Sequence, residues 1–192
     1  TGNDIVFKTG NNSSDAERMR ISSGGNVLLG GLTSLPSSSV FGSAFWNITG
    51  GRQILRQSTS ITSSASLQQF FNPNGQVGSI NVSGSSTSYS TSSDYRLKEN
   101  VTLITDALSR LNQLKPSRFN FIADADRTVD GFIAHEVQDI IPEAISGEKD
   151  AVSEDGTPYY QGIDQSKIVP LLTAAIQEQQ AQIELLKQEV EL

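Results

Sequence analysis

Apolar and polar residues alternate along the first part of the chain. Residues 4–8 and 17–21 place apolar side chains at about every second position, as a β-strand with one covered face does. Residues 27–29 are apolar and follow a Ser-Ser-Gly-Gly-Asn stretch that is typical of a turn. The sequence therefore predicts short strands joined by tight turns in this part.

Large apolar side chains are sparse in residues 53–93, where Ser, Thr, Gly and Asn separate them. Such a segment buries too little apolar area alone to offset the entropy of ordering the chain. Two interpretations remain: a disordered Ser/Thr linker, or β-structure that shares a core with copies of itself. Alternation in residues 78–83 favours strands, and strands that share a core require an oligomer.

The second part of the chain has the pattern of a small α+β domain. Pro116 and Pro142 end its two short apolar helical patterns. Its expected elements are, in order, a helix over 102–114, a strand over 118–122, a polar turn over 124–131, a helix over 136–141 and a hairpin over 152–160.

The last 25 residues give the strictest periodicity, with alternating spacings of three and four. The positions are Val169, Leu172, Ile176, Gln179, Ile183, Leu186 and Val190; we call them the α-seam. This is the a/d pattern of a coiled coil, and its stripe is narrower than a helix packed on its own domain usually needs. We expect a coiled-coil helix over about 166–192; the alternative is an amphipathic helix packed on its own domain. The α-seam alone does not fix the number of strands.

Composition divides the chain at Ser93-Asp94. Ser, Thr and Gly account for 42 of residues 1–93 but for 14 of residues 94–192. The first part has five basic and three acidic residues, and the second has nine and 18, so the net charge of −7 comes from the second part. We therefore expect two domains, 1–93 and 94–192.

Several classes of function are disfavoured. The chain has no Cys, which excludes disulfides, thiolate chemistry and Cys-ligated metals. Its acidic charge argues against nucleic-acid binding, and it has no apolar run long enough for membrane insertion. No basic stretch followed by an apolar core opens the sequence, so no secretory signal is expected within it. We expect no cofactor and no metal: the Asp-rich stretch 124–131 has its Gly at the eighth position instead of the sixth that a calcium loop uses.

The chemistry-bearing candidates lie at the break in composition, in Ser93-Asp-Tyr-Arg-Leu-Lys-Glu-Asn100. Ser93 is a nucleophile if Lys98 is neutral, which burial beside apolar groups arranges. Taken alone, a Ser five residues before a Lys is typical of a solvated loop in so Ser-rich a chain.

The whole string changes that weight, because it resembles the start of the C-terminal intramolecular chaperone and auto-cleavage domain of phage tailspikes, tail fibres and endosialidases. The resemblance continues, in the same order, through Leu108–Pro116, Gly131–Gln138 and residues 164–172. It covers essentially all of residues 93–192. Residues 1–92 are similar to the trimeric β-rich fibre that such domains follow, although that likeness is generic.

The resemblance implies a domain that trimerises, guides folding of the preceding β-structure and then releases itself. Cleavage is expected at Ser93-Asp94 by a Ser–Lys dyad of Ser93 and Lys98, a single-turnover serine endopeptidase without activity on other proteins. Arg96, His135 and Glu136 are secondary site candidates. His135 is the only His, and without the resemblance a hydrogen-bonded histidine beside a helix start is favoured.

The expected fold is thus a β-rich homotrimeric fibre segment followed by a small α+β domain with a long C-terminal helix in a trimeric coiled coil. The expected partners are copies of the same chain and, for the mature fibre, a host-cell receptor. The expected location is the virion, from which the cleaved domain is absent.

Two alternative functions and one chemical question stay open. The chain is alternatively a structural or receptor-binding fibre segment that never cleaves. A relative that releases a DNA-binding region is disfavoured by the acidic charge. Ser93 attacks its preceding carbonyl comfortably by an N→O shift, whereas attack on its own carbonyl needs a strained four-membered ring. If the bond cut is Ser93-Asp94, another chain's Ser93, a water or help from the Asp94 carboxylate is to be considered, and the released fragment starts with Ser93 or with Asp94 accordingly.

Overall fold

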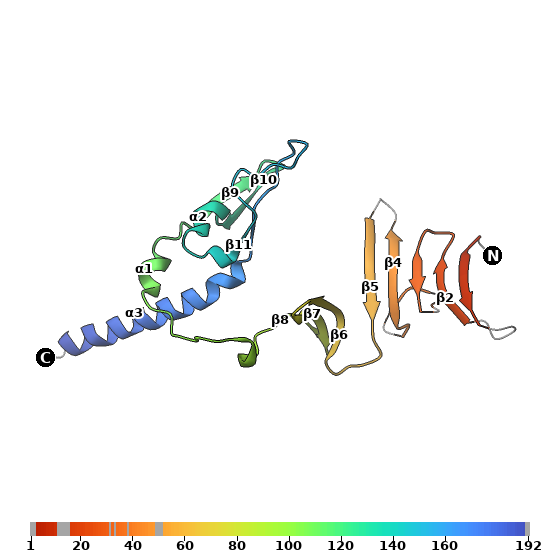
Figure 1. The fold of residues 1–192 in the computed structure, drawn as a ribbon, viewed down its shortest axis with the longest axis horizontal. Coiled ribbons are helices and arrows are strands. Elements are labelled where there is room, and N and C mark those ends of the chain that lie inside the picture. The colour runs from red at the N-terminus through yellow and green to blue at the C-terminus, as the bar shows by residue number, and fades with distance from the viewer. Residues whose placement is uncertain are drawn as a thin grey trace. The chain divides into compact units, whose positions relative to one another are not determined.

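The structure is a computed structural model that describes residues 3–10, 16–30, 32, 34–37, 39–48 and 52–190. It divides into two compact units, Thr1–Glu99 and Asn100–Leu192. Figure 1 shows the strands of the first unit and the long C-terminal helix of the second. The fold is therefore β-rich with one long C-terminal helix. No helix in the described ranges is both long and apolar enough to cross a membrane.

The N-terminal unit begins with a five-stranded antiparallel sheet in the order β1-β2-β3-β4-β5. Its strands are β1 (Ile5–Thr9), β2 (Ala16–Ile21), β3 (Val27–Leu29), β4 (Gly42–Ile48) and β5 (Arg52–Ser58). The strands expected over 4–8, 17–21 and 27–29 are confirmed. Each strand pairs with the next along the chain, so local turns fix the register.

The two faces of this sheet differ in burial. Leu28 and Ala44 point to one face, where Leu32, Leu35 and Val40 of the β3–β4 connection cover them. The other face carries one apolar residue from every strand in direct cross-strand register. We call this the β-row: Ile5, Ile21, Val27, Phe45 and Leu55. Phe45 keeps half of its surface exposed, so the described residues of the unit leave the β-row only partly covered.

A second, three-stranded antiparallel sheet follows, made of β6 (Ala65–Asn72), β7 (Gly75–Ser83) and β8 (Ser86–Thr91). Gly75 and Gly84 take positive φ at its two tight turns, a conformation that glycine adopts without strain. Strands therefore replace the disordered linker that was the other interpretation of residues 53–93. The large side chains of this sheet, such as Phe71 and Tyr89, remain exposed.

The C-terminal unit is a small mixed body at one end of a long helix. Figure 1 shows β9, β10 and α2 grouped near the start of α3. The elements are α1 (Ala107–Leu111), β9 (Ser117–Phe121), β10 (Asp124–Gly131), α2 (Ala134–Gln138), η2 (Pro142–Ala144), β11 (Ile145–Ser146), β12 (Gly162–Ile163), η3 (Gln165–Ile168) and α3 (Val169–Val190). The predicted strand over 118–122 is confirmed as β9, and the short helix before Pro142 forms as α2, two residues earlier than expected.

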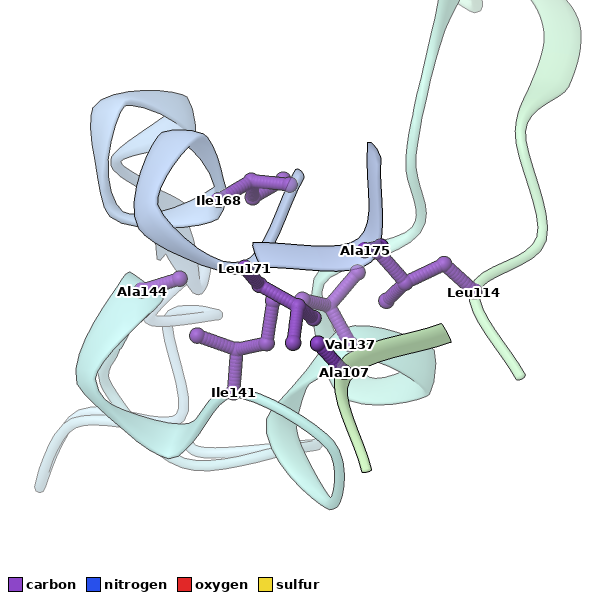
Figure 2. Packing of buried hydrophobic residues seen from close by; sticks show 8 residues of the cluster. All are labelled: Ala107, Leu114, Val137, Ile141, Ala144, Ile168, Leu171 and Ala175. Atoms are coloured by element: carbon purple, nitrogen blue, oxygen red, sulfur yellow. The ribbon is translucent and has the colours of Figure 1, made fainter. Parts of the chain in front are cut away.

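Eight buried aliphatic residues from α1, α2, η2, η3, α3 and their connections form the core of this unit (Figure 2). They are Ala107, Leu114, Val137, Ile141, Ala144, Ile168, Leu171 and Ala175. The alanines let the short helices approach α3 closely, and Ile141 and Val137 fill the centre. Apolar burial here is what holds α3 to the small body.

The helix predicted over 102–114 is shorter than expected. Asp106 adopts a left-handed conformation with φ of 55°, which interrupts a helix, and α1 begins only at Ala107. The carboxylate of Glu178 on α3 then accepts the backbone amides of Ala107 and Leu108 at 2.9 and 2.8 Å. The cap comes from a residue 70 positions away in sequence, which local patterns do not reveal. Leu103, expected on the helical stripe, is instead 92% exposed.

The predicted polar turn over 124–131 is wrong, because these residues form β10. Asp130 lies directly opposite Arg118 of β9, and their side chains make an ion pair at 2.7 Å. The turn proper is Ile122-Ala123, and the register shifts between Asp124 and Thr128. Asp residues are disfavoured in strands by propensity, but cross-strand pairing offsets that preference here. The hairpin expected over 152–160 is reduced to a single bridge between Val152 and Pro158.

The long helix α3 presents two different apolar faces. Leu171 and Ala175 face its own small body and are buried. The apolar members of the α-seam are 40–85% exposed, from Leu172 to Val190. The predicted helix is confirmed from Val169 to Val190, after the 3₁₀ turn η3, and residues 191–192 lie outside the described residues. The helix does pack on its own domain, but through a face other than the α-seam.

The packing in Figure 2 gives a first prediction. Ile141→Ala removes a side chain that is 1% exposed and leaves a cavity. We expect the free energy of unfolding of the C-terminal unit to fall by about 2–5 kcal/mol, measured by urea unfolding followed through the helical circular dichroism signal. Ile122→Ala at the exposed β9–β10 turn is the control, expected to change it by less than about 0.5 kcal/mol. Equal effects of both variants would contradict the assigned core.

Candidate functional site

Ser93 lies immediately after the last residue that the second sheet holds. The backbone amide of Ser92 donates to the carbonyl oxygen of Val77 at 3.1 Å. The Ser92 hydroxyl donates to the carbonyl oxygen of Gln76 at 2.8 Å. Strand β7 therefore fixes the chain up to Ser92, and Ser93 starts from a well-defined position.

The residues after Ser93 fold back in a short turn, the 3₁₀ helix η1 (Tyr95–Leu97). Asp94 caps it: its Oδ1 accepts the backbone amide of Arg96 at 2.9 Å, and its carbonyl accepts the amide of Leu97 at 3.1 Å. The amide of Lys98 then donates to the carbonyl of Tyr95 at 3.1 Å. This turn reverses the chain and brings Lys98 back towards Ser93.

Lys98 contacts Ser93 through two atoms. Its Nζ lies 2.7 Å from Ser93 Oγ and 3.2 Å from the Ser93 carbonyl oxygen. That carbonyl belongs to the Ser93–Asp94 peptide bond. One amine thus reaches both a hydroxyl and the carbonyl of the bond that follows it. Both side chains are exposed in the single chain.

Asp94 and Arg96 form a fork-shaped ion pair across the same turn. Arg96 Nε and Nη2 each lie 2.9 Å from a different oxygen of the Asp94 carboxylate. The hydrogen bonds from the Arg96 side chain and from its backbone amide lower the pKa of Asp94 below its ordinary value. The carboxylate stays ionised, and both of its oxygens are occupied.

The structure therefore brings together Ser93, Asp94, Arg96 and Lys98 of the predicted site residues. His135 and Glu136 belong to the other unit, on α2. Glu136 pairs with Lys115 at 3.4 Å, and their roles at the cleavage site stay predictions.

A hollow of about 410 Å³ lies beside His135, lined by residues 148–152 and 158–161. Across the ranges that the structure describes, no three His, Asp or Glu side chains gather as metal ligands. The hollow therefore offers a shape without an evident chemistry, and we assign it no role.

Comparison with known families bears directly on this turn. Residues 93–146 match the model of a peptidase family described as chaperone of endosialidase. This match, over little more than a quarter of the chain, supports a chaperone-of-endosialidase domain in its second part. The match starts at Ser93, the residue that Lys98 contacts, and ends at Ser146 in β11. No curated protein matches the chain.

The chaperone-of-endosialidase match identifies a C-terminal intramolecular chaperone domain of phage tail proteins. The family's classification as a peptidase implies self-cleaving activity in general. Sequence reasoning found Ser93, Lys98 and Arg96 only through resemblance. It missed the Ser92 anchor and the Asp94–Arg96 fork, although an Asp at the first position of a turn is a recognisable capping signal.

The fork gives a second prediction. In a Ser93→Ala background, which keeps the turn but lacks the hydroxyl, NMR titration should show Asp94 with a pKa below its ordinary value of about 3.9. Arg96→Ala should raise it back towards that value, because the guanidinium no longer stabilises the anion. Since the folded pKa is lowered, the fork persists above it and is lost as pH falls through it. Lys115→Ala, which removes the same charge elsewhere, should leave Asp94 unchanged. An Asp94 pKa that stays equally low in the Arg96→Ala variant would contradict the pairing.

Proposed function

We propose that the chain is the C-terminal part of a phage tail fibre or tailspike, and that residues 94–192 form a chaperone domain that trimerises the chains. In this proposal the domain directs folding of the β-structured residues 1–93 and then releases itself by autoproteolysis at Ser93–Asp94. The observation that carries it is the 2.7 Å contact between Lys98 Nζ and Ser93 Oγ at the first residue of the family match.

The chemistry proceeds through a neutral Lys98 amine. The amine takes the proton of the attacking hydroxyl, which is the Ser93 of a neighbouring copy or a water, and the oxygen nucleophile attacks the carbonyl carbon of the scissile bond. The C–N bond breaks, and the departing Asp94 nitrogen receives the proton from the Lys98 ammonium. Where serine is the attacking group, water then hydrolyses the resulting ester. The Lys98 contact with the Ser93 carbonyl oxygen adds polarisation of that carbonyl.

The geometry limits which group can act as the nucleophile. Ser93 cannot reach its own carbonyl carbon without a four-membered ring. Help from the Asp94 carboxylate is disfavoured, because both oxygens bind Arg96. Attack by the Ser93 of a neighbouring copy and attack by a water that Lys98 activates remain. Both cut the Ser93–Asp94 bond, so the released fragment begins with Asp94.

Assembly would bury the Lys98 amine, which is exposed in the single chain. A lysine acts as a base only as the neutral amine, and burial favours that form. Lys98 is exposed here, and its neighbours Tyr95 and Leu97 expose 81% and 69% of their surface. Contact with further copies would cover these side chains and desolvate the amine. Cleavage then waits for the trimer.

Both units offer faces that suit copies of the same chain. The β-row gives the N-terminal unit an uncharged, half-exposed apolar face opposite its own covered core. The α-seam gives α3 a second apolar stripe away from its own body. Exposed apolar faces of this size mark interaction surfaces. We propose that three β-rows meet in the fibre and three α-seams meet in a coiled coil.

A folding aid suits this β-structure. Strands rich in Ser, Thr and Gly carry weak register information, and pairing between chains forms slowly because its contacts are non-local. A coiled coil at the chain ends raises the effective concentration of the three strands near the junction. Once the domain is released, the fibre is kinetically hard to unfold. The product belongs to the virion, where a host receptor is its expected partner.

One observation favours a second candidate function. The exposure of Lys98 in the single chain suits a purely structural, receptor-binding fibre segment that trimerises and never cleaves. The two functions differ in whether each chain of the purified trimer stays uncut.

The dyad gives a third prediction. Mass spectrometry of the denatured protein should find fragments 1–93 and 94–192. Ser93→Ala should stay intact where a neighbour's Ser93 attacks and should still cleave where a water attacks. Lys98→Ala should leave only the intact chain in both cases. Lys98→Arg should do the same, because guanidinium keeps the charge but does not act as a base. Ser85→Ala, an exposed serine at the β7–β8 turn, is the matched control and should still cleave. An intact wild-type trimer, or cleavage of the Lys98 variants, would overturn the mechanism.

The α-seam gives a fourth prediction. Ile176 is 63% exposed in the single chain, so Ile176→Asp spares the core of the unit but places a charge in the seam. We expect it to abolish the trimer in analytical ultracentrifugation and to slow cleavage at least tenfold. Ala181→Asp, outside the seam, is the control and should trimerise and cleave normally. A monomeric Ile176 variant that cleaves at the normal rate would separate cleavage from assembly.

A further inference from the structure

An apolar pocket of about 320 Å³ opens beside the first turn of α3. Six of its seven lining residues are apolar and come from the α1 region, from β10's end and from α3's start. They are Leu111, Leu114, Pro116, Phe132, Ile168 and Leu172, with Gln165 as the polar member. Leu172 also belongs to the α-seam and is 40% exposed. The pocket is therefore continuous with the proposed coiled-coil surface.

The same unit has an apolar segment with nothing to cover it. Residues 101–104, Val-Thr-Leu-Ile, lie outside any helix or strand just before α1. Val101 is 79% exposed and Leu103 is 92% exposed, the highest value for any leucine among the described residues. Two large aliphatic side chains in four residues are costly to leave in water. Each chain thus has one unfilled apolar pocket and one uncovered apolar segment.

The chain length allows the two features to lie at the same height along α3. Glu178 holds the start of α1, so Ala107 sits at the level of Glu178. Leu172 lies six residues earlier in the helix, about 9 Å along the axis. Leu103 is four residues before Ala107, a span of up to about 13 Å in extended chain. A three-fold axis parallel to α3 preserves height, so the segment of one copy can reach the pocket of the next.

We propose that, in the trimer, Leu103 of each copy inserts into the Leu111–Phe132–Leu172 pocket of a neighbouring copy. This contact rests on the trimer of the proposed function. It adds a second interface between the chains, outside the coiled coil. It is heterologous, and three copies close it into a ring with every pocket filled once. The segment lies between the scissile bond and α1, so the same contact fixes the chain that leads to Lys98.

Disulfide trapping tests the contact, because the chain has no native Cys. The test uses the full chain with Lys98→Ala, which keeps it intact, plus Leu103→Cys and Leu111→Cys. Under mild oxidation we expect covalent trimers on a non-reducing denaturing gel, since each copy is joined to both neighbours. The matched control combines Ile122→Cys with Leu111→Cys; Ile122 is fully exposed but lies at the β9–β10 turn. It should give no covalent trimer.

Ultracentrifugation of the same samples separates the possible failures. Trimers in solution that yield only intrachain disulfides, or that cross-link no better than the control, overturn the inserted leucine and leave the trimer standing. Monomers in solution overturn both the inference and the proposed function. As a second measurement, Leu103→Asp should weaken the trimer at least tenfold in dissociation constant, whereas Ile122→Asp should not. Equal behaviour of these two variants would also overturn the insertion.

Discussion

Neither unit of this chain buries all of its apolar surface by itself, and the rest of the structure depends on this constraint. Each unit covers one apolar face with its own residues and leaves a second face to solvent: the β-row in the first unit, the α-seam in the second. Apolar burial is the main favourable term in folding, and this is the physical reason for the proposal that further copies cover these faces. The shapes of the sheet, the helix and the junction between them are all suited to a chain that completes its interior by assembly.

The turn at Ser93 shows how little is needed to organise a reactive centre. One Asp cap and one guanidinium fork hold a five-residue loop, and the loop returns Lys98 to the serine that precedes it. The groups are adjacent in sequence, so the centre needs no distant partner for its geometry. What the isolated turn lacks is a dry environment. Geometry therefore comes from the local sequence, and in the proposed function the assembled state supplies the dry environment.

Sequence reasoning succeeded where a short-range period decides the structure. Alternation gave β1 to β3, and the spacing of three and four gave α3. It failed where a distant residue decides. The helix start at Ala107 depends on Asp106 taking positive φ and on the Glu178 cap, and β10 depends on pairing with Arg118 and its strand. At the site, the residue types were predictable from resemblance. The contact of Lys98 with the Ser93 carbonyl oxygen was not, because it depends on how the turn between them folds.

The Ser92 anchor determines what kind of chain end would remain. The last sheet hydrogen bonds are made by Ser92, one residue before the scissile bond. A chain cut after Ser93 would end in a single free residue next to a paired strand. Chain ends fray unless they are tied down, and Ser92 ties this one to β7. A released N-terminal part would thus end in an ordered strand and not in a loose tail.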